Sequence, residues 1–174
     1  VLMTSCGQYQ SLLKSNDYNL VYKKAIEYYN KGDYQRAMNL LDGVRSVFVG
    51  QAKAQNIAYY RAFCSYNMKD YQIASDLFKQ FIQTYPESSF AEECLYMMGF
   101  CDYKASPKPR LDQQVTEKAI REFQLYLSRY PYSMRKDKVN TYMDEMRDKL
   151  SYKAYLSAKN YYLREHYKAA VISL

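Results

Sequence analysis

The chain has 174 residues and a formal net charge of +7, from 25 Lys and Arg against 18 Asp and Glu. Only five Gly and four Pro are present, too few for a turn-rich β fold or a low-complexity chain, and no apolar run approaches the ~18 residues of a membrane-spanning helix. One His without a nearby Cys pair disfavours a zinc site or a His-based catalytic triad. These numbers predict one helical domain that is not an enzyme and needs no cofactor or metal.

The first seven residues resemble the end of a bacterial lipoprotein signal, in which apolar and small residues precede a Cys that is acylated with fatty acids such as palmitate. Here that residue is Cys6, and the polar segment 8–19 after it is typical of a tether. No Asp follows Cys6, which favours the outer over the inner membrane. We expect residues 1–17 to be a signal remnant and linker, and residues 18–174 to form the folded domain. The alternative is an ordinary Cys near a frayed end.

Three helix pairs are predicted after the linker. The first two are interrupted at Gly32 and Asp70, and the third by a longer insertion with two prolines. The second and third pairs end before Pro86 and Pro131, since proline cannot continue a helix. The expected pairs are residues 18–31 with 34–49, 55–68 with 71–85, and 90–104 with 115–130.

Residues 134–150 carry one apolar helical face, but their phase relative to the pairs is open. They are either the first helix of a further pair, with residues 151–165 as its partner, or the front of one long helix. Another copy of the pattern starts at Ala158 and breaks off at Leu174. We therefore expect the repeat domain to be truncated at its carboxyl end.

Four columns of residues recur with a step of 37 along the first helices of the three pairs. Their offsets of 3, 4 and 7 place them on one helix face. With Gly-Asp-Tyr at residues 32–34 and small residues opposite large ones, the pattern resembles the tetratricopeptide repeat. That resemblance implies an all-α fold, an α-α superhelix of helical hairpins. The columns are Tyr22, Tyr59 and Tyr96; Ala25, Ala62 and Gly99; Ile26, Phe63 and Phe100; and Tyr29, Tyr66 and Tyr103.

In tetratricopeptide proteins the first helices line a concave groove, and the Tyr columns fall at groove positions. Tyrosine offers a large contact area and a hydrogen-bonding tip, so such a groove suits an extended peptide with aromatic side chains. Asn30 and Asn67 would pair with its backbone amides. The alternative is core packing between helices, which we favour for the column of Ile26. The candidate peptide-binding residues are Tyr22, Tyr29, Asn30, Tyr59, Phe63, Tyr66, Asn67, Tyr96 and Tyr103.

Three cysteines lie within the predicted repeats. Cys64 and Cys101 occupy the same position in adjacent repeats, on helix axes ~10 Å apart, and Cys94 is ~10 Å from Cys101 along one helix. Both separations exceed the ~7 Å limit for a disulfide. We expect free, mostly buried thiols.

The positive charge is concentrated in residues 104–153, which carry 12 basic and 7 acidic side chains. This excess suits an acidic protein or lipid headgroups, or it is a solvated helix face. Nucleic acid is disfavoured because no dense basic run is present.

Several short segments occur in a family-specific order. They are Tyr-Pro-Glu-Ser-Ser at 85–89, Leu-Tyr-Met-Met-Gly-Phe at 95–100, Asp-Gln at 112–113 within the insertion, and Arg-Asp-Lys-Leu at 147–150. Over residues 18–174 this order resembles the BamD-type lipoproteins of the outer-membrane β-barrel assembly machinery.

The resemblance implies a non-enzymatic, lipid-anchored scaffold on the periplasmic face of the outer membrane. Its amino-terminal repeats would bind the carboxy-terminal strands of unfolded outer-membrane proteins, and its later repeats the periplasmic domains of the barrel-assembly subunit. An outer-membrane glycan-capture lipoprotein is disfavoured because no Trp is present. A pilus or secretin pilot lipoprotein is disfavoured by the insertion at 104–117.

Overall fold

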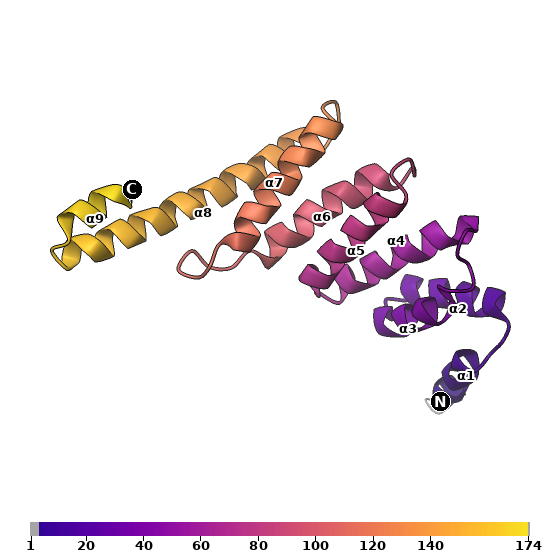
Figure 1. Ribbon diagram of the computed structural model, residues 1–174. Helices are drawn as coiled ribbons and strands as arrows, with labels where there is room; N and C mark the ends of the chain where they lie inside the picture. Colours follow the sequence, from indigo (N-terminus) through magenta and orange to yellow (C-terminus); the bar gives the residue numbers. More distant parts are fainter. Residues whose placement is uncertain (1–3, 174) are drawn as a thin grey trace. The chain divides into compact units, whose positions relative to one another are not determined.

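The computed structural model describes residues 4–173, with side chains from Gly7 onward, and consists of α-helices joined by short turns (Figure 1). No strand occurs within these residues, and the predicted all-α fold of consecutive helical hairpins is confirmed. The chain divides into two compact units, Val1–Cys94 and Leu95–Leu174. The helices are α1 (Thr4–Leu13), α2 (Tyr18–Asn30), α3 (Tyr34–Val44), α4 (Ala52–Asn67), α5 (Tyr71–Thr84), α6 (Ala91–Ala105), α7 (Gln114–Arg129), α8 (Lys136–Leu163) and α9 (Tyr167–Ile172).

The first unit contains two hairpins, α2 with α3 and α4 with α5. Helices α2 and α3 begin with Asp caps: Asp17 accepts a hydrogen bond from the Leu20 amide at 3.0 Å, and Asp33 from the Arg36 amide at 3.2 Å. Each cap satisfies an amide that has no partner within its helix. The apolar faces of these helices meet in a core, and burial of each large side chain there stabilises the fold by about 1.5–3 kcal/mol. That core includes Leu40, Leu41, Val44 and Ile57.

The same tight turn closes three hairpins, and each copy has one residue with positive φ. Between α2 and α3 this residue is Gly32 (φ 80°), whose amide donates to the Tyr29 carbonyl at 2.9 Å. Between α4 and α5 it is Lys69 (φ 67°), and between α8 and α9 it is Glu165 (φ 62°). This conformation costs residues other than Gly about 1–2 kcal/mol. The repeated turn is therefore maintained by the packing of the helices it joins.

Helix α1 packs against the first hairpin, whereas the sequence predicts a polar linker over residues 8–19. Tyr9 is buried; its ring meets Tyr28 edge-on at 5.9 Å, and its hydroxyl accepts a hydrogen bond from the Asn39 amide at 3.1 Å. The predicted linker is thus helical up to Leu13. One buried ring in a polar segment produces too weak a pattern to reveal such a helix.

In the second unit, α6 and α7 meet where Gly99 lies against the ring of Phe123. Helix α8 then runs for 28 residues, so residues 134–150 are the front of one long helix, and the alternative of a further pair with residues 151–165 is wrong. The short α9 packs against α8. Among the described residues, no helix is both long enough and apolar enough to cross a bilayer.

The insertion between α6 and α7 is held by a polar network. The buried Gln113 amide donates to the Lys108 carbonyl at 2.8 Å, and its oxygen accepts from the Thr116 hydroxyl at 2.7 Å. The hydroxyls of Thr116 and Ser106 are 2.6 Å apart, and the Lys149 ammonium of α8 donates to Ser106 at 2.6 Å. The insertion is therefore tied to both α7 and α8.

Cys64, Cys94 and Cys101 are free and buried, as predicted. Burial raises the pKa of the Cys64 and Cys94 thiols to about 12, so both are protonated and unreactive at neutral pH.

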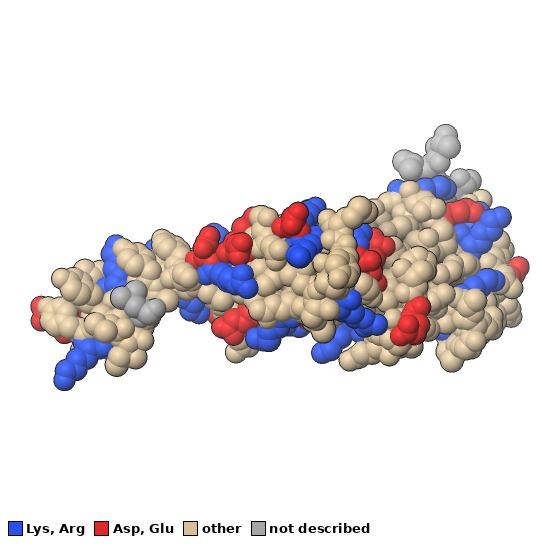
Figure 2. Space-filling view, turned by 90° about the horizontal axis from the view of Figure 1, so that it is seen from above, with Lys and Arg blue, Asp and Glu red and all other residues tan. Residues whose placement is uncertain are grey.

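On the face shown in Figure 2, cationic and anionic side chains are interspersed.

Candidate functional site

A cleft with aromatic walls opens in the first unit between α2 and α4. Its volume is about 520 Å³, within the usual range of small-ligand pockets. We refer to it as the aromatic cleft. It is lined by Tyr22, Lys23, Ile26, Glu27, Asn30, Asn56, Tyr59, Tyr60 and Phe90.

Helical periodicity brings these side chains to one place. Tyr22, Ile26 and Asn30 are each four residues apart on α2. On α4, Asn56 lies one turn before the two adjacent tyrosines. The last ring, Phe90, comes from the turn that precedes α6. Residues from three parts of the chain therefore meet in the aromatic cleft.

Tyr59 is held by both its hydroxyl and its ring. The hydroxyl donates to Glu93 Oε2 at 2.7 Å, and the ring centroid lies 4.6 Å from Phe90 and 4.5 Å from Phe63. Burial raises the pKa of Tyr59, and the hydrogen bond to the Glu93 carboxylate raises it further. The hydroxyl therefore remains a protonated donor at neutral pH.

Tyr22 contributes from α2 and contacts both apolar and cationic neighbours. Its ring centroid lies 6.1 Å from that of Phe48 and 5.7 Å from the Lys53 ammonium. Burial raises the pKa of Tyr22, and a hydrogen bond with Asn56 opposes this shift. Because Asn56 belongs to α4, polar groups of both helices lie at the aromatic cleft.

The aromatic cleft combines apolar walls with a few polar groups. Asn30 is exposed, while Lys23 and Glu27 carry opposite charges. Such a lining can enclose an aromatic or branched side chain of an extended peptide and pair with its backbone. Within the described residues, no group of His, Cys, Asp and Glu side chains is placed to hold a metal ion.

Three of the predicted peptide-binding residues, Tyr22, Asn30 and Tyr59, line the aromatic cleft. Phe63 lies beside it, with its ring centroid 5.0 Å from that of Phe78 and 4.5 Å from that of Tyr59. Phe63 therefore supports a wall of the cleft and is half-buried in the hairpin.

Tyr29, Tyr66 and Asn67 interact mainly with other parts of the first unit. The Tyr29 ring meets Tyr60 at 4.9 Å, and burial raises the pKa of Tyr29 to about 12. The Asn67 amide donates to the Phe63 carbonyl at 2.8 Å. Tyr66 packs 6.4 Å from Phe63. The predicted pairing of Asn67 with a peptide would compete with its hydrogen bond to Phe63.

Tyr96, the third member of the Tyr22 column, is a core residue of the second unit. Only 7% of its surface is exposed. Its ring lies 6.3 Å from Phe123 and 5.9 Å from Tyr126, and the Arg135 guanidinium lies 4.9 Å from its centroid. These neighbours cover the ring, so Tyr96 packs in the core and does not face a groove as the repeat pattern predicts.

Tyr103 belongs to a stack of rings between α6 and α8. Its hydroxyl donates to Glu145, which raises the pKa of Tyr103 to about 12, and its ring stacks on Tyr142 at 4.5 Å. Tyr103 is half-buried. Because this stack of rings belongs to the second unit, Tyr103 is not part of the aromatic cleft.

The sequence did not predict the other six residues of the aromatic cleft, which are Lys23, Ile26, Glu27, Asn56, Tyr60 and Phe90. Ile26 was expected in the core, but it lines the cleft and is half-buried. Tyr60 follows a predicted groove residue directly, and Asn56 precedes it by one turn, so a wider helix face would have included both. Phe90 lies outside the repeat columns, in the turn before α6, and no periodic signal marks it.

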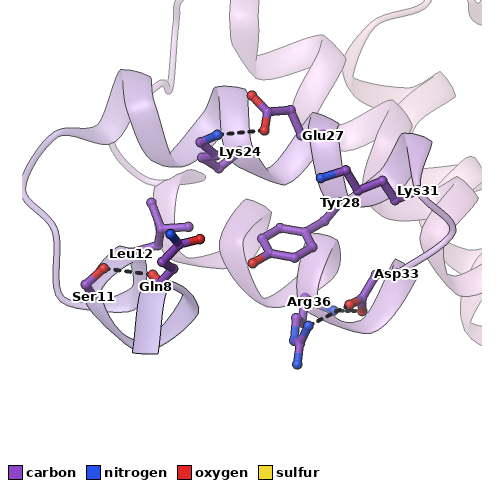
Figure 3. Close-up of a pocket in the computed structure, with 9 residues that line it drawn as sticks. All are labelled: Gln8, Ser11, Leu12, Lys24, Glu27, Tyr28, Lys31, Asp33 and Arg36. Carbon is purple, nitrogen blue, oxygen red and sulfur yellow. Dashed lines mark hydrogen bonds and ion pairs between the residues drawn. The ribbon is translucent and has the colours of Figure 1, made fainter. Parts of the chain in front are cut away.

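A second cleft lies between α1 and the first hairpin and has a volume of about 550 Å³ (Figure 3). Its charged groups are largely paired: Lys24 with Glu27 at 2.7 Å, and Arg36 with Asp33 at 3.1 Å. Tyr28 points into it from α2. Since four of its five charged groups form these two ion pairs, this cleft offers less recognition chemistry than the aromatic cleft.

The predicted acylation site, Cys6, lies in α1, but its side chain is outside the described part of the structure. The model of the family YfiO, described as outer membrane lipoprotein, matches residues 14–173 of the chain. No curated protein matches the chain.

Proposed function

The chain belongs to the outer membrane lipoprotein family YfiO, and we propose that it is a non-enzymatic scaffold of outer-membrane β-barrel assembly. In this proposal it is anchored by lipid at Cys6 to the periplasmic face of the outer membrane. It binds unfolded outer-membrane proteins and other subunits of the assembly machinery.

The aromatic cleft carries the client-binding part of the proposal. Four aromatic rings and an aliphatic side chain line it, and Asn30 and Asn56 supply amide groups beside them. A strand from an unfolded barrel protein alternates apolar and polar residues and carries aromatic residues near membrane interfaces. One such apolar side chain would fill the aromatic cleft, while the amides pair with the adjacent backbone.

The second unit supports the part of the proposal that concerns assembly partners. Its basic excess over residues 104–153 suits an acidic protein surface. The insertion is tied to α7 and α8 by hydrogen bonds, so it presents a defined backbone to a partner.

The client-binding proposal is tested with a labelled peptide of alternating sequence that ends in Phe. Fluorescence anisotropy should show binding to the full chain. Replacing Tyr22 or Tyr59 by Ala should weaken it by about 1–3 kcal/mol, as expected for buried aromatic anchors. Asn30→Ala, at an exposed position, tests the amide contact without removing a packed ring.

Tyr152→Ala is the matched control, because Tyr152 is a half-exposed tyrosine on α8 outside the aromatic cleft. Its affinity should equal that of the unmodified chain. Circular dichroism should show that all variants are folded. Equal affinity of the folded Tyr22, Tyr59 and Asn30 variants would remove the aromatic cleft as the client site.

The anchor is tested separately by the intact mass of the protein extracted from membranes. A diacyl or triacyl adduct that disappears in Cys6→Ser supports the anchor. An unmodified mass rejects it.

A further inference from the structure

Two turns of the protein have the same backbone structure, one in each unit. They are residues 84–93, from the last residue of α5 into the first turn of α6, and residues 129–138, from the last residue of α7 into the first turn of α8. Tyr85 and Tyr130 end their helices with nearly equal dihedral angles, φ −130° and ψ 60° against φ −128° and ψ 64°. The amides of Ser88 and Ser133 each donate to the carbonyl of that tyrosine at 3.1 Å. The two turns can therefore be compared position by position.

The side chains at the tips of these turns differ in polarity. Glu87 and Ser89 are the exposed tip residues of the first turn. The equivalent residues of the second turn are Tyr132 and Met134, which are 98% and 102% exposed. The first turn shows that this backbone forms with polar side chains at the tip. The two apolar side chains are therefore not required by the fold of the second turn.

The charge around the two turns also has opposite sign. Residues 84–93 contain three Glu and no basic residue, a net charge of −3. Residues 129–138 contain Arg129, Arg135, Lys136 and Lys138 against one Asp, a net charge of +3. A reversal of six charges between equivalent turns accompanies the change from polar to apolar tips.

We propose that the turn at residues 129–138 is a membrane contact that inserts Tyr132 and Met134 into the headgroup region of an anionic bilayer. Tyrosine is favoured at this depth, because its apolar ring contacts the lipid while its hydroxyl remains hydrated. The surrounding cations attract anionic phosphates. This contact is additional to the acyl anchor and independent of the aromatic cleft.

The shape of the tip favours a lipid surface over a protein partner. Side chains that are almost fully exposed protrude from the protein, and a protrusion enters a deformable interface without needing a matching cavity. The tip is also held in place, because the Ser133 hydroxyl lies 2.6 Å from the Tyr126 hydroxyl and accepts a hydrogen bond from the Arg135 amide at 3.2 Å. Insertion therefore orders the turn little further, and little conformational entropy is lost.

The absence of Trp from the sequence allows a direct test. The full chain carries Cys6→Ser, so that no acyl group contributes, and Tyr132→Trp, which is then its sole tryptophan. Addition of phosphatidylglycerol-containing vesicles should shift the Trp emission to the blue, and brominated lipids should quench it. Pure phosphatidylcholine vesicles should produce neither change. Salt should weaken the effect by screening the cations.

The loss-of-function variant transfers the polar tip of the first turn to the second. Tyr132→Glu with Met134→Ser, in the Cys6→Ser chain, should lower partitioning onto phosphatidylglycerol vesicles by about tenfold. The control is Val49→Ser, which removes a 74% exposed apolar side chain from the α3–α4 turn and should leave partitioning unchanged. Unchanged Trp emission, or a double variant that partitions normally, overturns the proposal. If that double variant instead loses an acidic protein partner, the tip belongs to a protein interface and the membrane contact is wrong.

Discussion

Gly99 lies so close to Phe123 that a β-carbon on the glycine would stand 2.8 Å from Cδ1 and 3.0 Å from Cε1 of the ring. Phe123 is fully buried, with the rings of Tyr96 and Tyr142 6.3 Å and 5.9 Å away. The ring therefore has little room to move aside. This contact is what the repeat pattern predicts, in which a small residue on the first helix allows a large one on the second to approach.

Gly99→Ala should destabilise the second unit by about 1–3 kcal/mol, the usual cost of overpacking a core. The measurement is the free energy of unfolding in urea. Gly43→Ala is the matched control, because Gly43 is also helical but has no atom within 4 Å of its added β-carbon. It should raise stability by up to about 1 kcal/mol through helix propensity. Equal effects of the two substitutions would contradict the close contact.

The hydrogen bond from Tyr59 to Glu93 joins α4 to the start of α6 within the first unit. Tyr59→Phe keeps the ring and removes the donor, so it should cost about 1 kcal/mol of unfolding free energy. Glu93→Gln keeps an acceptor oxygen and should cost less. It should also lower the pKa of Tyr59, which the Glu93 carboxylate helps to raise, and tyrosinate absorbance would report the change. No change in that titration would show that the hydrogen bond is weak in solution.

The helical hairpins could be predicted from the sequence because their signal is repeated. Small and large residues recur at helical spacing, and Gly32 and Asp70 mark the breaks. The positive φ of Lys69 is the exception, since nothing in a lysine indicates that conformation. The positive φ is imposed by the turn between α4 and α5, in which Lys69 lies.

The candidate site could be predicted only in part, because equivalent sequence positions have different neighbours. Tyr22 and Tyr59 line the aromatic cleft, whereas Tyr96 in the same column is covered. One residue that covers it, Arg135, precedes the long helix whose phase the sequence left open. Phe90 was missed because a turn residue has no periodicity.

Alkaline pH should destabilise the first unit through Tyr29. Burial raises the pKa of Tyr29 to about 12, against about 10 for an unfolded tyrosine. The raised pKa means that the folded state binds the proton of Tyr29 more tightly than the unfolded state does. The contribution of Tyr29 to the free energy of unfolding is therefore complete below pH 10 and is lost between pH 10 and 12. In Tyr29→Phe, the urea midpoint should fall less steeply over this range than in the unmodified chain. Parallel slopes would contradict the burial of the hydroxyl.

Lys118 is the cation of a covered acidic site between α6 and α7. Its ammonium lies 2.9 Å from Asp102 Oδ2 and 3.7 Å from Glu122 Oε1, and the Asp102 side chain is 2% exposed. Lys118→Met would leave two carboxylates together without this cation. Removing one partner of a buried ion pair costs about 3–5 kcal/mol, and the lower end applies because Lys118 is one-third exposed.

Urea unfolding at neutral pH measures the Lys118→Met loss. Arg121→Met on the same helix is the matched control: Arg121 pairs with Glu117 at 4.0 Å and is 65% exposed, so its removal should cost less than about 1 kcal/mol. A loss as small as that of Arg121→Met would mean that Lys118 does not compensate the Asp102 carboxylate.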